Sequence, residues 1–582
     1  MTLFEKITFL KPVLKKLLRL MTRKHKIYLC LMLVMTIGFS LVETIGISAI
    51  MPFISIVSDP SLLESGWYKK AFDFFGFAGV EKFIITIGIG IIFFYFFRAM
   101  YSILLTYFMN RYSISMYRYF SVKLFRINLS VPFKVYAQKN SAEQMQAISG
   151  ETHAVGSVAY NVLQLCSEIF TVLMVYAVIV LLNWKMTLVV TAILLFMVIF
   201  LLSLLTRISS IQGEKRYASA RKMNRTLKET FGNLKYVKLK GNEEDILRSY
   251  KKSIEINTRS EMITNVLGIA PKGILESIGF SMLIAAIVFI IWVYHDASKV
   301  IPTISMYALA LYRILPSIHR MLQNINNIAY SEKTLESVDE NLRQEAIEEG
   351  DAPLSFERSI RLENINFKYL TGDDVINGIS LEIKKGEKAA FTGESGSGKS
   401  TLVDIITGIH KPISGKVYID DTVLTDDNIR SWRKKIGYIP QSIYLFDGTV
   451  AENVSFGSTP DEEKIKTALQ KANIWDFLSQ KEGLNTLVGD GGIQLSGGQQ
   501  QRIGIARALY DDPEVLVLDE ATSALDTETE QKIMDEIYSV SANKTLIVIA
   551  HRLSTVERCD RRIRIGNGRI VEGTANQPVS AL

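Results

Sequence analysis

The sequence predicts a multi-domain membrane protein, in which an all-α domain with six transmembrane helices precedes an α/β domain. Three observations predict this fold class. The chain has 582 residues, which are too many for one hydrophobic core. Hydrophobic residues make up 48% of it and the mean hydropathy is +0.18, with the excess before residue 325. From Ile360 on, short apolar strands alternate with helical stretches, which is typical of α/β domains.

Residues 1–26 are predicted to form a basic amphipathic helix on the cytoplasmic face of the membrane. Lysine and arginine interleave with apolar side chains there, and Glu5 is the only acidic residue. The segment has neither the long apolar centre nor the small-residue cleavage site of a signal peptide. We therefore expect it to lie on the membrane surface.

Six apolar spans follow, which predicts a transmembrane domain over residues 27–330. The spans are expected at about 27–57, 83–110, 154–182, 186–206, 269–294 and 300–325. Segments 111–153 and 207–268 are rich in lysine and arginine, so the positive-inside rule places them and both termini in the cytoplasm. Both segments are helical in composition, and we expect them to turn back at a break. The breaks are expected near 132–141 in the first segment, and near Gly232 or Gly241 in the second.

The loop between the first two spans is predicted to hold an extracellular helix at about 60–77, in the outer membrane interface. Its apolar side chains recur at helical spacing opposite charged ones. These apolar residues are Leu63, Trp67, Ala71, Phe74 and Phe75. The alternative is a segment that only caps the ends of the spans.

Residues 331–355 are polar and acidic, which is typical of a linker, and the α/β domain is expected over 356–582. The net charge of +7 does not indicate nucleic-acid binding, because the basic residues flank the apolar spans. Three cysteines lie far apart, which makes a disulfide framework or a metal cluster improbable.

A glycine-rich loop between an apolar strand and a helix is the most informative motif. It reads Gly393-Glu394-Ser395-Gly396-Ser397-Gly398-Lys399-Ser400-Thr401. Glycines let successive N–H groups point at a phosphate, and the following helix directs the positive end of its dipole there. Lys399 can reach the β- and γ-phosphates of a nucleotide, and the Ser400 hydroxyl is placed to ligate Mg²⁺. A chance match to a glycine-rich turn is the alternative for this motif taken alone.

Two further motifs complete a site for ATP hydrolysis. The apolar run 515–518 predicts a buried strand that ends at Asp519, a ligand for Mg²⁺, and Glu520 then follows as general base for the attacking water. The second motif predicts a helix that Ser496 caps and whose free N–H groups bind a γ-phosphate. It reads Leu495-Ser496-Gly497-Gly498-Gln499.

The order and spacing of these motifs resemble those of ABC-transporter ATPases, and the whole chain resembles an exporter-type (type IV) half-transporter. The resemblance implies an α/β P-loop ABC ATPase domain that hydrolyses ATP with Mg²⁺. It also implies a bacterial inner-membrane homodimer, with ATP between the glycine loop of one subunit and the Leu495–Gln499 signature of the other.

The same resemblance assigns four further roles in the ATPase domain. Tyr369 would stack on adenine, Gln441 would be the Q-loop residue at Mg²⁺, Asp526 would belong to the D-loop, and His551 would be the catalytic switch histidine at the γ-phosphate. A single histidine after a strand is more often structural, but the accompanying motifs favour the catalytic role.

Three basic residues inside the spans point to the substrate. Arg98, Lys272 and Arg313 each cost roughly 2.5–3.5 kcal/mol to insert, so we expect them to face the interior. One hypothesis is a basic substrate cavity for an anionic headgroup such as a pyrophosphate. The alternative is that they are paired structural ions, or that Lys272 extends to the membrane edge. The candidate partners are Glu43, Glu168 and Glu276.

These positions, with the stretches 43–48 and 309–313, resemble the lipid-linked oligosaccharide flippases of bacterial N-glycosylation. The resemblance implies that a polyprenyl-pyrophosphate oligosaccharide is flipped to the outer leaflet, for protein glycosylation or surface glycan assembly. Lys272 departs from an arginine expected there, and lysine lacks the bidentate fork. A multidrug or lipid A-type exporter of the same ABC family is the alternative.

Overall fold

The computed structural model describes residues 10–58, 60–64, 69–70, 72–73, 79–182, 184–294, 301–344, 346–370, 372–519, 527–550 and 556–571. The predicted residues Glu520, Asp526 and His551 lie outside them, as does half of the expected helix at 60–77. The chain divides into two compact units. The first comprises Met1–Leu129 and Lys139–Gln344, and the second comprises Ser130–Gln138 and Glu345–Leu582.

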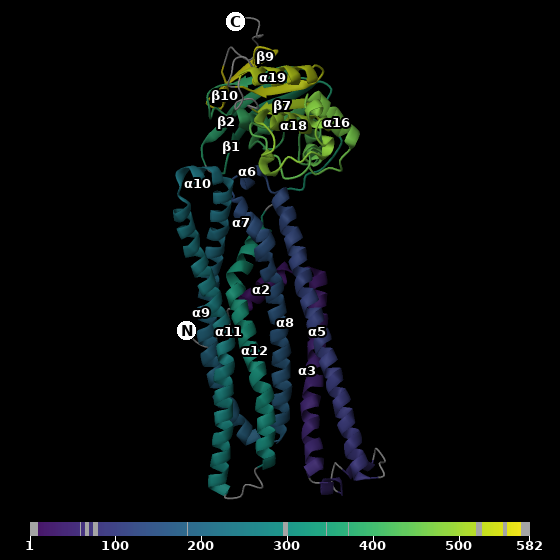
Figure 1. The fold of residues 1–582 in the computed structure, drawn as a ribbon, viewed down its shortest axis with the longest axis vertical. Coiled ribbons are helices and arrows are strands. Elements are labelled where there is room, and N and C mark those ends of the chain that lie inside the picture. Colours follow the sequence, from purple (N-terminus) through teal and green to yellow (C-terminus); the bar gives the residue numbers. More distant parts are fainter. Residues whose placement is uncertain are drawn as a thin grey trace. The chain divides into compact units, whose positions relative to one another are not determined.

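The first unit is built from long helices, several of which lie side by side (Figure 1). They are α2 (Leu10–Leu20), α3 (Arg23–Ser58), α5 (Val80–Ser130), α8 (Thr152–Leu182), α9 (Trp184–Gly232), α11 (Glu243–Tyr294) and α12 (Ile301–Leu342). Shorter helical segments are η1 (Pro60–Glu64), α7 (Ser141–Gln146), the π-helical η2 (Ala147–Glu151) and α10 (Leu234–Lys240).

Five helices in the described part of the chain are long and apolar enough to cross a membrane. They are Arg23–Val57, Val80–Ser130, Ser141–Val180, Thr191–Gly232 and Glu243–Ala285, and each covers all or most of one expected span. The sixth span, expected at 300–325, lies within α12. The predicted fold class, an all-α transmembrane domain fused to an α/β domain, is confirmed.

Both basic segments turn back at the predicted breaks. In the first, α5 ends at Ser130 and a four-residue helix, α6 (Phe133–Tyr136), begins directly after Pro132, whose ring suits the entry to a helix. In the second, α9 ends at Gly232, and α10 ends at Lys240 with Gly241 as its C-cap at a φ of 63°. That left-handed conformation favours glycine and stops the helix.

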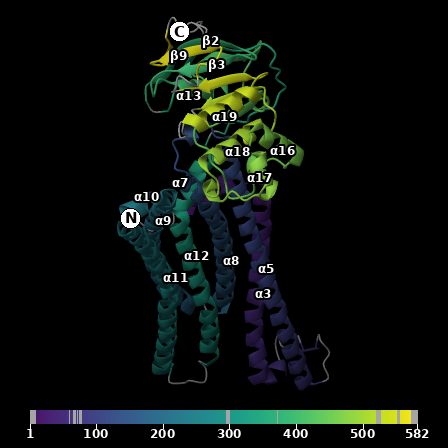
Figure 2. The same ribbon diagram turned by 45° about the horizontal axis from the view of Figure 1, so that its top comes forward.

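Two apolar clusters hold the first unit together, and α12 belongs to both. One cluster joins α2, α3, α5, α8 and α12, with Met116 and Leu335 fully buried. The other joins α9, α11 and α12 around Leu275. Figures 1 and 2 both show α3 beside α5 and α9 beside α11. Large apolar side chains also point outward, such as Phe96 at 72% exposure, which suits a helix surrounded by lipid.

The second unit contains two sheets. An antiparallel sheet has the order β2-β1-β4-β5, with β1 (Ser359–Lys368), β2 (Asp374–Lys384), β4 (Ser414–Ile419) and β5 (Thr422–Val423). The other sheet has the order β10-β9-β3-β8-β7-β6, in which all neighbours except β10 and β9 pair in parallel. Its strands are β3 (Lys388–Thr392), β6 (Ile436–Ile439), β7 (Val515–Asp519), β8 (Thr545–Ile549), β9 (Arg561–Gly566) and β10 (Arg569–Ile570).

Side chains of the larger sheet alternate between two cores. Leu516 and Leu518 of β7 pack in one core with α15 (Val450–Ser455), α16 (Glu462–Lys471), α18 (Gly497–Leu509) and α19 (Thr527–Val540). Of these helices, α16, α18 and α19 group together in Figure 2. Val515 and Val517 pack in the other core with α13 (Lys399–Ile406) and the antiparallel sheet. This two-sided burial explains the continuous apolar run at 515–518 and confirms the predicted strand.

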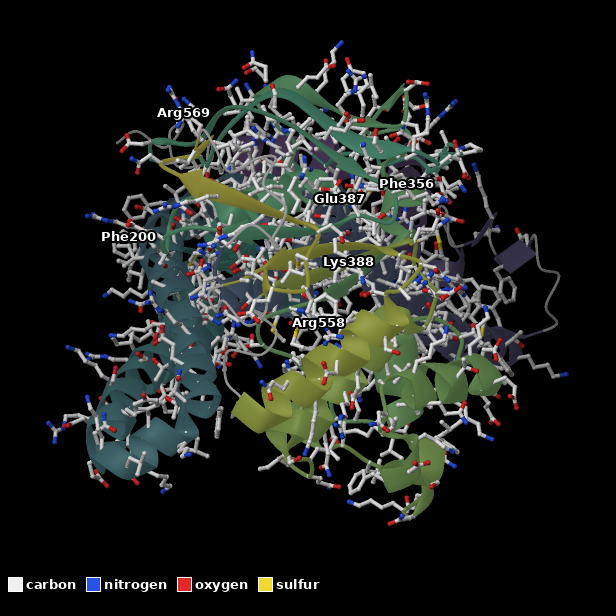
Figure 3. The ribbon with its side chains drawn as sticks, turned by 90° about the horizontal axis from the view of Figure 1, so that it is seen from above. Phe200, Phe356, Glu387, Lys388, Arg558 and Arg569 are labelled. Carbon is white, nitrogen blue, oxygen red and sulfur yellow. The ribbon has the colours of Figure 1, made fainter. Side chains whose placement is uncertain are left out.

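The short helices of the second unit lie in its connections. They are α14 (Ile429–Arg433), α17 (Trp475–Ser479), η3 (Gly483–Asn485) and η4 (Asp490–Gly492). At the amino-terminal end of the parallel strands, Tyr538 of α19 accepts two cation–π contacts, from Lys388 at 5.5 Å and Arg558 at 4.6 Å (Figure 3). These contacts stabilise the edge of the sheet opposite to that from which the predicted motifs extend.

Candidate functional site

The carboxyl ends of the parallel strands bring three predicted motifs to one edge of the sheet. The glycine loop 393–398 follows β3, Gln441 follows β6, and Asp519 ends β7. The strand pairs β6–β7 and β3–β8 are in register, with Ile439 opposite Leu518 and Phe391 opposite Ile549. In open α/β sheets this edge is where ligands bind. The strand β8 leads to the predicted His551, which lies outside the described residues.

The glycine loop has a backbone that favours glycine at three of its positions, Gly393, Gly396 and Gly398. Gly393 has a φ of 144°, and a Cβ there would lie 2.1 Å from the Ile565 carbonyl oxygen. Gly398 has a φ of 101° and directly precedes α13. Lys399 Nζ donates to the carbonyl oxygens of Gly393 (3.0 Å) and Glu394 (2.8 Å), so its side chain lies across the loop. The ammonium group is thus held where the loop curls, at the start of α13.

Asp519 is oriented by a residue that the sequence analysis missed. The Tyr438 hydroxyl on β6 donates to Asp519 Oδ2 at 2.8 Å. Burial, reinforced by the Asp519 charge, raises the pKa of Tyr438 above its ordinary value, so the phenol remains a donor at neutral pH. The sequence carried one signal for Tyr438, which lies only three residues before Gln441. Tyr438 lies on β6, the strand that pairs with β7, and Gln441 follows that strand.

A second missed residue is Asp404, one turn after Ser400 on α13. Burial raises the pKa of its carboxyl group to about 6, and the Asp519 charge adds to this effect. The i, i+4 spacing from Ser400 could have placed it on the same helix face. The candidate site therefore holds, besides Asp519, a carboxyl group whose pKa is raised to about 6.

Replacing Asp404 with asparagine is expected to stabilise the nucleotide-free protein at pH 7.5, by up to about 3 kcal/mol, and to have little effect below about pH 4. The folded-state pKa is raised, so protonation favours folding. That contribution is complete below the unfolded-state pKa and is lost as the pH rises through about 6. Unfolding midpoints at acid and neutral pH test this, with the exposed Asp373→Asn as control. An equal shift of the D404N midpoint at all pH values would contradict it.

Tyr369 lies beside α13, as its predicted role requires. It directly follows β1, and its hydroxyl lies 3.1 Å from the Thr401 hydroxyl in the first turn of α13. The structure therefore brings together two residues that lie 32 positions apart in the chain. The predicted adenine-stacking aromatic and the glycine-loop helix thus form one side of the candidate site.

The predicted signature begins a helix in the manner expected from the sequence. Ser496 caps α18, with its hydroxyl accepting from Gln499 N (3.4 Å) and the Gln499 side chain accepting from Ser496 N (2.9 Å). Gly497 has open space around its Cβ position. Leu495 packs in the core with α18, on the sheet face opposite to that of α13. The signature and the glycine loop therefore extend from elements on opposite faces of one sheet.

In the first unit, two of the three predicted cavity residues share one carboxylate. Glu43 of α3 is 1% exposed and pairs with Arg98 of α5 and with Arg313 of α12. Arg98 Nε donates to Glu43 Oε2 at 2.8 Å, and Arg313 reaches Glu43 Oε1 at 2.9 Å. Two guanidinium groups and one carboxylate leave a net charge of +1. Arg313 Nε is buried without a hydrogen-bond partner among the described residues.

A second ion pair lies two turns further along α12. Arg320 donates to both oxygens of Glu168 on α8, with Nη2 to Oε2 at 3.0 Å, and to the Ser317 hydroxyl at 3.3 Å. The sequence analysis named Glu168 as a partner but missed Arg320. Lys272, the third predicted cavity residue, is exposed on α11 and forms no salt bridge with any residue that the structure describes. It does not join the Glu43 cluster.

Comparisons with known proteins cover both units. Residues 376–523 match the family described as ABC transporter, and residues 27–313 match the ABC transporter transmembrane region. The ATP-dependent lipid A-core flippase of Burkholderia pseudomallei (strain 1710b) is 30% identical over 466 residues, which cover 78% of each chain. The heterocyst differentiation ATP-binding protein HepA of Nostoc sp. is 31% identical over 452 residues, covering 75% of this chain and 72% of HepA.

A solved structure of a bacterial Atm1-family ABC exporter with ATP bound shares the fold. It has a TM-score of 0.72 at 22% identity, and the match covers 94% of this chain and 95% of the other. Long apolar helices fused to an α/β unit that carries a glycine loop of the phosphate-binding type define a nucleotide-driven integral membrane transporter. The chain belongs to the ABC transporters, as an exporter-type (type IV) half-transporter, and it is an ATP hydrolase coupled to transport.

Proposed function

We propose that the protein flips a pyrophosphate-linked polyprenyl oligosaccharide from the inner to the outer leaflet of a bacterial inner membrane, with its termini and ATPase domain in the cytoplasm. The observation that carries the proposal is the Arg98–Glu43–Arg313 cluster. Its net positive charge suits an anionic headgroup, as does Arg313 Nε, which has no hydrogen-bond partner among the residues that the structure describes. A buried donor without an acceptor is costly, and a ligand oxygen would relieve that cost.

The sequence resemblance to PglK, the lipid-linked oligosaccharide flippase, supports the same cargo. Arg98 and Arg313 take the positions that the resemblance assigns to the cavity, and Lys272 adds a further exposed charge. Arg320 lies two turns from Arg313 on the same helix, but Glu168 already neutralises it. We therefore assign headgroup contact to Arg313 first and to Arg98 second.

For the nucleotide, we propose that Ser400, Gln441 and Asp519 hold Mg²⁺ and that the glycine loop holds the phosphates. The donor set fits, since Ser400 is exposed at the start of α13 and Asp519 ends a strand at the same edge. Tyr438 occupies only one Asp519 oxygen, which leaves the other for a metal or its water. Glu520 would act as general base, with His551 at the γ-phosphate and Asp526 in the D-loop.

We further propose that the active form is a homodimer. The signature and the glycine loop extend from opposite faces of one sheet, so a second copy is the simplest source of a signature that faces the loop. The tip formed by α10 also exposes large apolar side chains, with Tyr236 at 71% and Leu239 at 75%. Such a surface is expected to be covered in the assembled protein.

Replacing Arg313 with glutamine is expected to lower flipping by about 10-fold or more, the effect of losing a charged hydrogen bond. It leaves Glu43 paired with Arg98, so the fold and the basal ATPase rate should be retained. The assay uses purified protein in vesicles with a polyprenyl-pyrophosphate glycan labelled on its sugar. The exposed Arg207→Gln, on α9, is the control. Unchanged flipping by R313Q would contradict the assignment.

A lipid A-type exporter is the second candidate, because several relatives at about 30% identity carry the name lipid A-core flippase. Lipid A also bears phosphate groups, so the Arg313 cluster alone does not separate the two cargoes. The vesicle assay does, when each lipid is supplied alone. Movement of lipid A with no movement of the pyrophosphate-linked glycan would establish the second candidate.

A further inference from the structure

Segment 130–138 lies between two helices of the first unit in the sequence but belongs to the second unit in the structure. It contains α6, and Ser130 O accepts from Ile347 N at 3.0 Å. The Phe133 ring lies 5.7 Å from the ring of His410, in the turn that follows α13. Because α5 and α7 flank the segment, any movement of these helices pulls on it directly.

His410 connects Phe133 to the aromatic residue beside the glycine loop. Its ring stacks on Phe367 at 4.9 Å and 27°, and meets Tyr369 edge to face at 5.5 Å. Phe367 in turn contacts Tyr369 at 5.2 Å. We call Phe133, Phe367, Tyr369 and His410 the His410 cluster. It forms a continuous aromatic path from α6 to the Tyr369–Thr401 hydrogen bond.

The contacts of His410 are made by its ring and not by its nitrogens. The side chain is 2% exposed, and Nδ1 has no hydrogen-bond partner among the described residues. Nε2 lies 3.8 Å from Asp404 Oδ2, beyond hydrogen-bond distance. Burial, with a smaller contribution from Lys134, lowers the pKa of His410, so the ring is neutral. Phenylalanine would stack equally well without a buried unsatisfied nitrogen.

We propose that His410 is a positioning residue for ATP binding, which holds the Tyr369 ring and links it to Phe133. A displacement of segment 130–138 then changes the orientation of Tyr369 and with it the affinity for ATP. The inference rests on the proposed role of Tyr369 at adenine, and it is independent of the transported lipid.

The test is the apparent KM for ATP and the kcat of the full chain in detergent, with no transport substrate added. His410→Ala and His410→Gln remove the ring and are expected to raise KM by about twofold to tenfold, the value of one aromatic contact. His410→Phe keeps the ring and should restore a near wild-type KM. A selective change in KM, with kcat retained, marks a loss of binding and not of chemistry.

Phe133→Ala provides the decisive variant, because Phe133 is 47% exposed and belongs to the segment between α5 and α7. F133A should raise KM, although the Phe133 ring contacts His410 and not Tyr369. The KM of the double variant F133A/H410A should be no higher than that of H410A alone. Tyr418→Ala, an aromatic truncation on β4, is the control and should leave KM unchanged.

Three results would overturn the inference. They are a wild-type KM in H410A or F133A, a KM in H410F as high as in H410A, and additive effects in the double variant. If H410A fails to fold, H410F and F133A still decide the question. Tyr369→Ala distinguishes the role of Tyr369 at adenine from its link to Phe133. If Y369A leaves KM unchanged, the assignment of Tyr369 to adenine is wrong. If only Y369A raises KM, the site stands and the link to Phe133 fails.

Discussion

Replacing Glu520 with glutamine is expected to lower ATP turnover by about 100-fold or more while ATP still binds. Glutamine keeps the size of the side chain but cannot accept a proton from the attacking water. The groups proposed to bind the phosphates, including Lys399 and the amino terminus of α13, are untouched. Phosphate release measures turnover, and a fluorescent ATP analogue measures binding. Since bound ATP is no longer hydrolysed, the variant should also accumulate as a closed dimer on a sizing column.

The matched control for this prediction is Glu482→Gln, an exposed carboxylate of the same unit. It should retain wild-type turnover. Hydrolysis by E520Q at a near wild-type rate would show that another group is the base. Asp404 would then be the first candidate, because burial and the Asp519 charge raise the pKa of this second carboxyl group to about 6.

Replacing Glu43 with glutamine is expected to destabilise the protein by about 3–5 kcal/mol, the cost of leaving a buried charge without its partner. Glu43 is 1% exposed and is the carboxylate that pairs with both Arg98 and Arg313 in the described structure. The change leaves two guanidinium groups facing each other, so repulsion adds to desolvation. The unfolding midpoint in detergent measures the effect.

Two further variants test the cause of this loss. Glu276→Gln, which removes a carboxylate on α11, should leave the midpoint close to that of the wild type. The double variant E43Q/R313Q carries one guanidinium fewer and should recover part of the lost stability. An unfolding midpoint of E43Q equal to that of the wild type would show that lipid or water, and not Glu43, compensates the charges of Arg98 and Arg313.

The features that follow from local pattern could be predicted from the sequence. The apolar spans, the buried strand at 515–518 and the Ser496 cap each depend on neighbours a few residues apart. The glycine loop is similar, because Gly393, Gly396 and Gly398 have φ angles of 144°, 80° and 101°, which glycine adopts without steric cost. These constraints can be recognised in the amino-acid sequence itself.

Features that depend on residues distant in the chain could not be predicted in the same way. Tyr438 reaches Asp519 across 81 residues, and Arg313 meets Glu43 only once α3, α5 and α12 are packed. The sequence grouped Lys272 with Arg98 and Arg313 because all three are basic and lie near or within spans. Lys272 lies on α11, and the shared carboxylate is on α3, so hydropathy could not separate them.

The helix α12 has the geometry of a lever, because one continuous element of 42 residues carries both charged pairs and the last turns before the linker. Pro316 lies one turn from Arg313 and cannot donate to the preceding turn, so the helix bends most easily there. About 36 Å of helix separates Arg313 from Ser337, at 1.5 Å per residue. A tilt of about 10° at this pivot would therefore sweep the far end through about 6 Å. If a headgroup binds at Arg313 as proposed, the length of this single helix would amplify a small rearrangement around it.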